Sequence, residues 1–196
     1  MTKKLEFREI SNQQSIEDLM EIILGLVGEK LNRQGLKETP KRVAKMYTEI
    51  FRGYDPKQKP AITVFSNNSD GVKYDGMITD RGHFYSHCEH HMVPFFGEYY
   101  FAYIPKKKII GLSKVARLVQ YHAAKLQVQE RLTKDILDDL ETALEPKGIA
   151  LILSARHLCK EMRGVREVGG VMQTSDMRGE FAKNYNTRQE FLKLIS

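Results

Sequence analysis

Four of the six histidines and one of the two cysteines of this 196-residue chain lie within nine positions, 83–91. Within this stretch, Cys88 and His91 are three residues apart. The second cysteine, Cys159, follows His157 by two residues. Thiolate and imidazole together form a ligand set that suits zinc. Because each cysteine has histidines beside it, the sequence predicts that folding brings Cys88, His91 and Cys159 together around one metal ion.

Three protein ligands leave a fourth position for water, which is the pattern of catalytic zinc sites. His90 and His157 then remain as acid–base groups beside that water. We expect His157 and Cys159 to lie in an extended stretch and to face the same side, since residues i and i+2 share a face of a strand. The alternative is that both cysteines are simply small buried apolar residues and that the Cys-x-x-His pair is incidental.

Several polar residues indicate an anionic ligand. Residues 111–114 (GLSK) begin a predicted helix, and a helix N-terminus with a hydroxyl and basic side chains is a candidate anion site. The candidate contacts are Ser113, Lys114, Arg117, Arg163, Arg42 and Lys45. Any one of them, taken alone, is more often a solvated surface residue. A Walker-type phosphate loop is excluded because the chain has no G-x-x-x-x-G-K-[ST] motif.

Gln129 and Glu130 begin the next predicted helix. The carboxylate of Glu130 has two interpretations. It is either a charge that stabilises the helix N-terminus or a partner for a base edge that offers hydrogen-bond donors.

Composition narrows the class of protein. The formal charge is +6 and the pI is about 9.2, which favours anionic partners without choosing among them. Hydrophobic residues make up 41% and charged residues 29%, as in globular proteins. Two cysteines are too few for a disulfide scaffold, and no apolar run approaches the length of a signal peptide or a membrane span. We therefore expect a cytoplasmic protein with no membrane partner.

Hydrophobic periodicity predicts an α+β fold with a largely antiparallel sheet and helices over one face. A first helix should run from Ser15 to Gly35, and a second from an N-capping Thr39 to Gly53. Further on, the pattern predicts strands at 95–104, 148–154 and 171–176, and helices at 112–125, 128–145 and 187–195.

Six segments carry a resemblance to a known family. They are residues 39–44 (TPKRVA), 88–91 (CEHH), 111–114 (GLSK), 127–133 (QVQERLT), 157–159 (HLC) together with 162–165 (MRGV), and 186–192 (NTRQEFL). In this order, over roughly residues 15 to 195, the chain resembles GTP cyclohydrolase I.

The resemblance implies a tunnelling fold (T-fold) in which a four-stranded antiparallel sheet is backed by two helices. An N-terminal helical extension (1–55) would precede this catalytic domain (56–196). It also implies a homodecamer of two stacked pentameric rings with active sites between subunits. The implied reaction converts GTP and water to formate and 7,8-dihydroneopterin triphosphate, the first step of tetrahydrofolate biosynthesis.

The resemblance also assigns roles by motif position. Cys88, His91 and Cys159 match the ligands of one Zn²⁺ per subunit, and His90 and His157 match the catalytic histidines. Gln129 and Glu130 match the guanine-recognition positions. The positions that match triphosphate contacts are Ser113, Lys114, Arg117 and Arg163, with Arg42 and Lys45 as weaker matches.

The chain departs from the family pattern at Lys160-Glu161 and at residues 171–174, both close to the expected site. These departures concern rate and affinity rather than identity. Three alternatives remain open: a related T-fold enzyme acting on a pterin or deazapurine, a zinc-stabilised nucleic-acid-binding module, and a catalytically inactive regulatory paralogue. Carboxylates lie between the basic residues of the predicted helices, which argues against nucleic acid as a partner.

Overall fold

The computed structural model describes residues 13–69 and 71–196. The chain divides into two compact units, 1–58 and 59–196. Residues 1–12 of the expected N-terminal extension lie outside the described residues.

The first unit contains helices α2 (Gln13–Leu26) and α3 (Thr39–Ile50), followed by two short 3₁₀ turns at Arg52–Tyr54 and Pro56–Gln58. The prediction that the first helix continues to Gly35 is wrong. The chain leaves the helix near Gly28, whose φ of 91° lies in the left-handed region that glycine adopts readily.

The expected cap of α3 is also wrong, although its first residue is correct. Thr39 is already helical, and Glu38 occupies the N-cap position without a side-chain capping bond. Pro40 lies in the first turn, as expected from its fixed φ and missing N–H.

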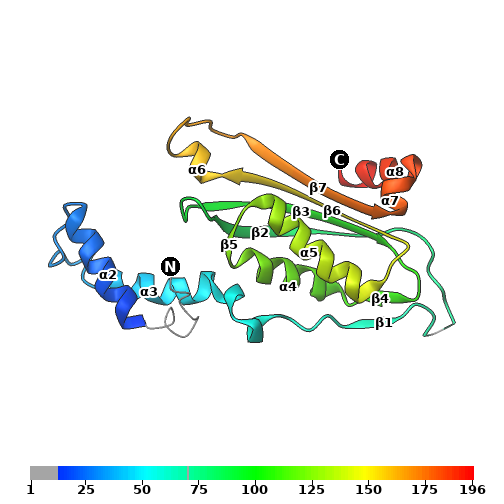
Figure 1. Cartoon of the computed structure of the whole chain (residues 1–196), viewed down its shortest axis with the longest axis horizontal. Helices are drawn as coiled ribbons and strands as arrows, with labels where there is room; N and C mark the ends of the chain where they lie inside the picture. The colour runs from blue at the N-terminus through cyan, green and yellow to red at the C-terminus, as the bar shows by residue number, and fades with distance from the viewer. Residues whose placement is uncertain (1–12, 70) are drawn as a thin grey trace, which may run out of the picture. The chain divides into compact units, whose positions relative to one another are not determined.

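The second unit is built around a five-stranded sheet with strand order β5-β2-β3-β6-β7 (Figure 1). Four long strands pair antiparallel: β2 (Ile78–Cys88), β3 (Pro94–Ile104), β6 (Gly148–His157) and β7 (Val171–Gly179). Neither β2 nor the fifth strand, β5 (Leu126–Gln127), was predicted from the sequence. Strand β5 pairs parallel to the end of β2. A separate pair joins β1 (Val64–Ser66) to β4 (Lys108–Ile110).

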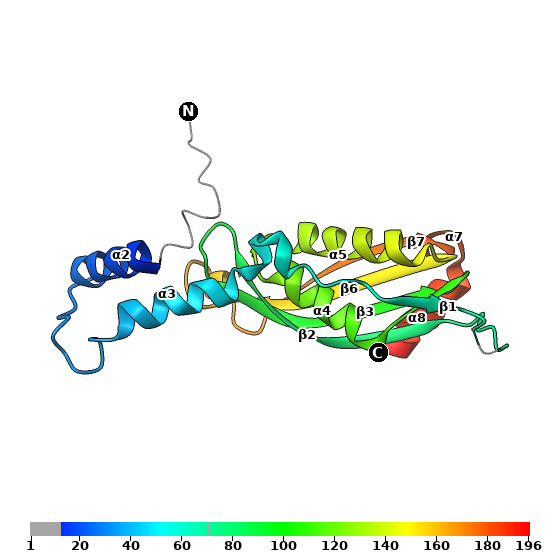
Figure 2. The ribbon, with the colours of Figure 1, turned by 90° about the horizontal axis from the view of Figure 1, so that it is seen from below.

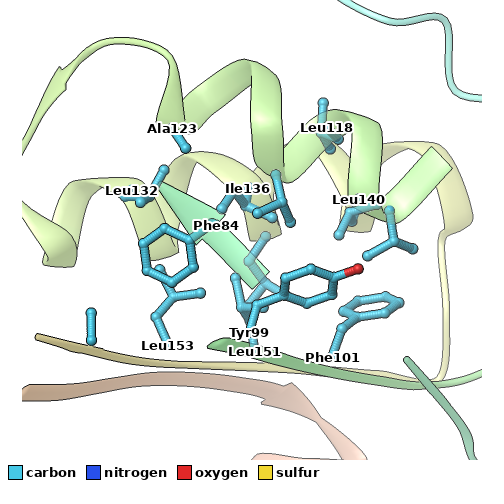
Figure 3. Packing of buried hydrophobic residues seen from close by; sticks show 14 of the residues in the cluster. Phe84, Tyr99, Phe101, Leu118, Ala123, Leu132, Ile136, Leu140, Leu151 and Leu153 are labelled. Atoms are coloured by element: carbon cyan, nitrogen blue, oxygen red, sulfur yellow. The ribbon is translucent and has the colours of Figure 1, made fainter. Parts of the chain in front are cut away.

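Helices α4 (Leu112–Ala123) and α5 (Gln129–Leu144) cover one face of the sheet. Alternate residues of the strands point into this layer, and Figure 3 shows Phe84, Tyr99 and Phe101 directed at leucines of the two helices. Leu118 and Leu140 are fully buried there. Removing such a side chain typically costs about 2–5 kcal/mol, so this layer holds the sheet and the helices in one arrangement.

The expectation that helices cover only one face needs correction. Two short C-terminal helices, α7 (Glu180–Lys183) and α8 (Tyr185–Ile195), pack Phe181 and Phe191 against Ala102, Ala150 and Ile152 on the opposite face. Figure 2 shows these helices at the end of the sheet where β1 lies. The strands therefore carry apolar residues on both faces at this end.

Within residues 13–69 and 71–196, every helix is too short or too polar to cross a membrane.

A polar cluster around the buried His122 joins α4 to α5. His122 Nε2 lies 2.8 Å from Asp139 Oδ2, and Lys59 Nζ is 2.8 Å from the same oxygen. Burial lowers the pKa of His122 below its ordinary value of 6.5, although Asp139 acts in the opposite direction. His122 is therefore a group that the unfolded chain protonates more readily than the folded protein does.

This difference predicts an acid-sensitive stability. Neutral His122 contributes fully to the free energy of unfolding above pH 6.5, the ordinary pKa of histidine in an unfolded chain. This contribution is lost as the pH falls toward the lowered pKa of His122 in the folded protein. Over that window, one proton corresponds to at most about 1.4 kcal/mol per pH unit. Denaturant unfolding of wild-type protein and His122→Gln between pH 7.5 and 5 should show a shallower pH dependence in the variant. Identical slopes would contradict this account.

Candidate metal and active site

The turn after β2 brings His91 back to Cys88. The carbonyl oxygen of Cys88 accepts hydrogen bonds from the N–H groups of His91, at 3.3 Å, and Met92, at 2.8 Å. The N–H of Cys88 donates to the carbonyl oxygen of Val93 at 2.9 Å. This closed turn places Nδ1 of His91 3.7 Å from Sγ of Cys88, as the Cys-x-x-His spacing predicts.

Strand pairing brings Cys159 to the same place. In the register, His87 lies opposite Pro94 and Phe95 lies opposite His157, so β2 and β6 end together at one end of the sheet. The chain then turns at once into the short helix α6 (Leu158–Glu161), which carries Cys159. The expected extended stretch from His157 to Cys159 is therefore wrong, because the strand ends at His157.

The ligand atoms of Cys88, His91 and Cys159 all lie within 4.8 Å of one another. In a tetrahedral zinc site with Zn–S of about 2.3 Å and Zn–N of about 2.05 Å, a sulfur and a nitrogen ligand are about 3.6 Å apart. The 3.7 Å between Cys88 Sγ and His91 Nδ1 fits that edge. Burial, together with the neighbouring Cys88 thiol, raises the pKa of Cys159, and a bound cation would favour its thiolate instead. The residues present thus fit a zinc ion.

The predicted acid–base histidines both border this group, in different environments. His157 ends β6, is half-buried, and stacks on Phe95 with ring centroids 4.5 Å apart. Burial lowers the pKa of His157. His90 has a side chain that is 64% exposed, and its Nδ1 lies 3.7 Å from Cys88 Sγ.

The two predicted guanine-recognition residues begin α5 at the same end of the sheet, and their side chains differ sharply in solvent exposure. Glu130 is exposed, and its charge acts to raise the pKa of His157, which places it within electrostatic range of that ring. Gln129 is only 1% exposed, and its amide is hydrogen-bonded to groups of the chain itself.

Of the predicted anion contacts, Arg163 is the one beside the metal ligands. Its Nη1 lies 3.0 Å from Nε2 of His91. Helix α4 begins next to β4 and ends next to β5, which pairs with Cys88 (Figure 1). The first turns of this helix, away from Cys88, carry Ser113, Lys114 and Arg117. A helix of 12 residues is about 18 Å long, so Ser113 and Lys114 lie most of a helix length, and Arg117 about half of one, from the end of α4 that leads to Cys88.

Arg42 and Lys45 are exposed on α3, one turn apart, in the first compact unit.

Two ion pairs near the site were not predicted from the sequence. Arg131 of α5 pairs with Glu89, and its Nε donates to Oε1 of Gln127 at 2.9 Å, which ties the Cys88–His91 turn to α5 and β5. Gln127 lies in β5 and Glu89 in a distant turn, so helical spacing gave no signal for these contacts of Arg131.

The second ion pair gives one of the family departures a structural role. Glu161 accepts two hydrogen bonds from Arg156, Nε to Oε1 at 2.8 Å and Nη2 to Oε2 at 2.6 Å. The guanidinium lowers the pKa of the Glu161 carboxyl. The pair fastens α6, with Cys159, to the end of β6.

Fold and site together define a protein of mixed helices and strands with a candidate Cys-His-Cys metal centre at one end of a largely antiparallel sheet. The sequence model of the family described as GTP cyclohydrolase I matches residues 16–196. The chain belongs to the GTP cyclohydrolase I family.

Individual relatives agree with this assignment. The chain is 45% identical over 188 residues to GTP cyclohydrolase 1 of Sulfurihydrogenibium sp. (strain YO3AOP1), covering 95% of this chain and 97% of the relative. It is 44% identical over 187 residues to GTP cyclohydrolase 1 of Campylobacter jejuni subsp. jejuni serotype O:6, covering 94% and 96%. It is also 49% identical over 181 residues to the bifunctional protein FolKE of Lactococcus lactis subsp. lactis, of which it spans about half, 52%.

Among solved structures, the chain is similar to the archaeosine synthase QueF-Like in the apo form, with 16% identity and a TM-score of 0.46 over 55% of this chain and 97% of that one. This likeness is too weak to define the fold.

The ligand geometry predicts one zinc per chain after purification. Cys159→Ser should lose the metal, because a hydroxyl is a much poorer zinc ligand than a thiolate. His90→Ala is the matched control: it removes a ring equally close to Cys88, yet it should keep the metal. Metal analysis of the three proteins checks this. Loss of zinc from His90→Ala with retention in Cys159→Ser would assign the site to a different ligand set.

Proposed function

We propose that this protein is a zinc-dependent GTP cyclohydrolase I that converts GTP and water to formate and 7,8-dihydroneopterin triphosphate. The observation that carries the proposal is the grouping of Cys88, His91 and Cys159 beside His157 and Glu130 in a member of this family. When bound, zinc supplies a coordinated water with a pKa lowered to about 7, suited to attack on C8 of the purine.

The two histidines suit two different proton transfers. Opening of the imidazole ring requires a proton on the departing ring nitrogen, and exposed His90 can take up that proton again from solvent. The later rearrangement of the ribose requires proton transfer at the sugar. We assign this step to His157, whose ring is held by stacking and is kept neutral near pH 7 by its lowered pKa.

Glu130 provides a basis for choosing guanine. Its carboxylate can accept hydrogen bonds from N1–H and the N2 amino group, two donors that adenine does not present in that arrangement. Its position in the first turn of α5 also stabilises the negative charge there. The side chain is exposed, and it is close enough to act on His157.

The triphosphate requires positive charge, and the chain provides it in separate places. Arg163 lies beside His91, with its Nη1 next to Nε2 of that ring. A metal on Nδ1 of His91 would leave the ring proton on Nε2, so Arg163 could not donate a hydrogen bond to that nitrogen. The Arg163 guanidinium would then be available to bind an anion. Along α4, Ser113 and Lys114 are most of a helix length, and Arg117 about half of one, from the helix end that leads to Cys88. Their separation supports an active site completed by a second copy of the chain.

We therefore propose the homodecamer of two stacked pentameric rings, with sites between subunits. The proposed subunit fold is the tunnelling fold: four long antiparallel strands backed by α4 and α5, to which β5 adds a short fifth strand. Arg42 and Lys45 are proposed as further phosphate contacts. We place the enzyme in the cytoplasm, at the first step of tetrahydrofolate biosynthesis.

Nucleic-acid binding is less well supported. Basic residues on α5 and β7 are paired with carboxylates: Lys134 with Asp138, and Arg178 with Asp138, Asp176 and Glu141. A helix that binds a groove of DNA needs unpaired basic side chains. The direct test is incubation of the zinc-loaded protein with GTP, with formate and the fluorescence of the oxidised pterin as readouts. Salt-dependent DNA binding without formate release would favour the nucleic-acid alternative.

Glu130→Gln should raise the KM for GTP strongly while leaving the fold intact. An amide places a donor against one of the two guanine donors, at a cost of about 1–3 kcal/mol, or about 5- to 150-fold in binding. GTP affinity is measured by calorimetry and folding by circular dichroism. Normal GTP affinity would mean that guanine is recognised elsewhere, and an unfolded variant would mean that Glu130 mainly stabilises the helix end.

His90→Ala and His157→Ala should each reduce turnover by about 10²–10⁴-fold, the usual worth of a general acid–base. Single-turnover product analysis should separate them: His90→Ala stops before the ring opens, whereas His157→Ala accumulates a ring-opened species. Zinc content is measured alongside. Near-normal turnover in both variants would contradict the acid–base roles, and loss of zinc from His157→Ala would make His157 a ligand.

A further inference from the structure

Gln129 is a buried residue whose amide is wholly engaged within the chain. Its Nε2 donates to the carbonyl oxygens of Leu153, at 3.0 Å, and Met172, at 3.1 Å. The same nitrogen lies 3.2 Å from Oγ1 of Thr174. On the other side of the amide, Oε1 lies 2.8 Å from Nε2 of His157. The side chain thus bridges β6, β7 and the proposed catalytic histidine.

The orientation of this amide follows from the nature of its partners. A main-chain carbonyl oxygen accepts hydrogen bonds and never donates them. The amide edge that faces Leu153 and Met172 must therefore be the NH₂ group. A flipped amide would set its oxygen against two carbonyl oxygens and leave buried groups unpaired, which is strongly unfavourable.

Two hydroxyl groups reinforce the same orientation. Oγ1 of Thr133 donates to the main-chain oxygen of Gln129 at 2.8 Å, since that oxygen can only accept. Thr133 and Thr174 are 2.7 Å apart, so Thr174 donates to Thr133. Thr174 then presents a lone pair to the NH₂ group of Gln129. The two N–H bonds of the amide thus face three acceptors, the two carbonyl oxygens and Thr174, none of which could pair with an amide oxygen in this arrangement.

The orientation of the Gln129 amide determines which ring nitrogen of His157 is protonated. Because Oε1 of Gln129 can only accept, Nε2 of His157 must carry a proton. The neutral ring then has its lone pair on Nδ1. Stacking against Phe95, with an interplanar angle of 3°, restricts rotation of the ring.

We propose that Gln129 is a positioning residue that fixes His157 as the Nε2–H tautomer, so that protons enter and leave the active site at Nδ1 of His157. In this role, the Gln129 side chain does not contact guanine, and base recognition is left to Glu130. The catalytic part of the inference rests on the proposed function, whereas the tautomer does not.

The tautomer can be measured directly on the zinc-loaded wild-type protein. With ¹⁵N-labelled histidine, magic-angle-spinning NMR at pH 8 distinguishes protonated from unprotonated ring nitrogens, and comparison with His157→Asn assigns the resonances. We expect His157 to show a protonated Nε2 and an unprotonated Nδ1. Any other pattern, whether Nδ1–H, a mixture of tautomers or a doubly protonated ring, overturns the proposal regardless of whether the protein turns over GTP.

Variants test the positioning role. Gln129→Leu should let His157 populate both tautomers and lower kcat by about 10- to 100-fold, with the KM for GTP changed less than about 3-fold. Gln127→Leu is the matched control, because Gln127 is also a buried glutamine but bonds the main-chain oxygen of His122 and Arg131, so it should leave the His157 tautomer unchanged.

If Gln129→Leu instead raises the KM for GTP and leaves the tautomer intact, Gln129 recognises the base and the proposal fails. Should that variant not fold, the wild-type spectrum alone decides. Absence of GTP turnover in wild-type protein with the expected tautomer would refute the proposed function and leave the tautomer assignment standing.

Discussion

The register of β2, β3 and β6 is the constraint on which the site depends. Cys88 lies at the end of β2, and β6 ends at His157, two residues before Cys159. Strand β3 lies between them and pairs with both, and it places the ends of β2 and β6 at the same end of the sheet, because Pro94 pairs with His87 and Phe95 pairs with His157. A slip of one residue would turn each strand over and move Tyr99 and Phe101 out of the layer under α4 and α5. The core therefore fixes the register, and the register assembles the ligands.

The polar contacts around the site then fix what the strands bring together. Arg131 ties the turn after β2 to α5, the Arg156–Glu161 pair fastens α6, and Gln129 holds His157. In each of these contacts, the charged or hydrogen-bonding groups are paired with other groups of the same chain. In contrast, Glu130 and His90 are exposed. The site thus combines side chains that are fixed by hydrogen bonds, such as His157, with side chains that are accessible to a substrate.

Local patterns in the sequence were sufficient to predict the grouping of Cys88, His91 and Cys159, the strands β3, β6 and β7 and the helices α4 and α5 that cover the sheet, whereas the long strand β2 was missed. The Cys-x-x-His spacing implies a turn, and alternating or helical apolar residues imply strands and helices. The early end of α2, the short strand β5 and the packing of Phe181 and Phe191 were missed, since they depend on one glycine conformation and on tertiary contacts. The role of Gln129 was out of reach because its four partners come from distant parts of the chain.

The proposed function depends above all on a zinc ion held by two cysteines and one histidine, with one position open to water. X-ray absorption at the zinc edge of the purified protein measures this coordination directly. We predict two sulfur ligands at about 2.3 Å and two nitrogen or oxygen ligands at about 2.0–2.1 Å, one from His91 and one from solvent. A zinc shell without sulfur, or one closed by a second histidine nitrogen in place of the solvent oxygen, would rule out this site.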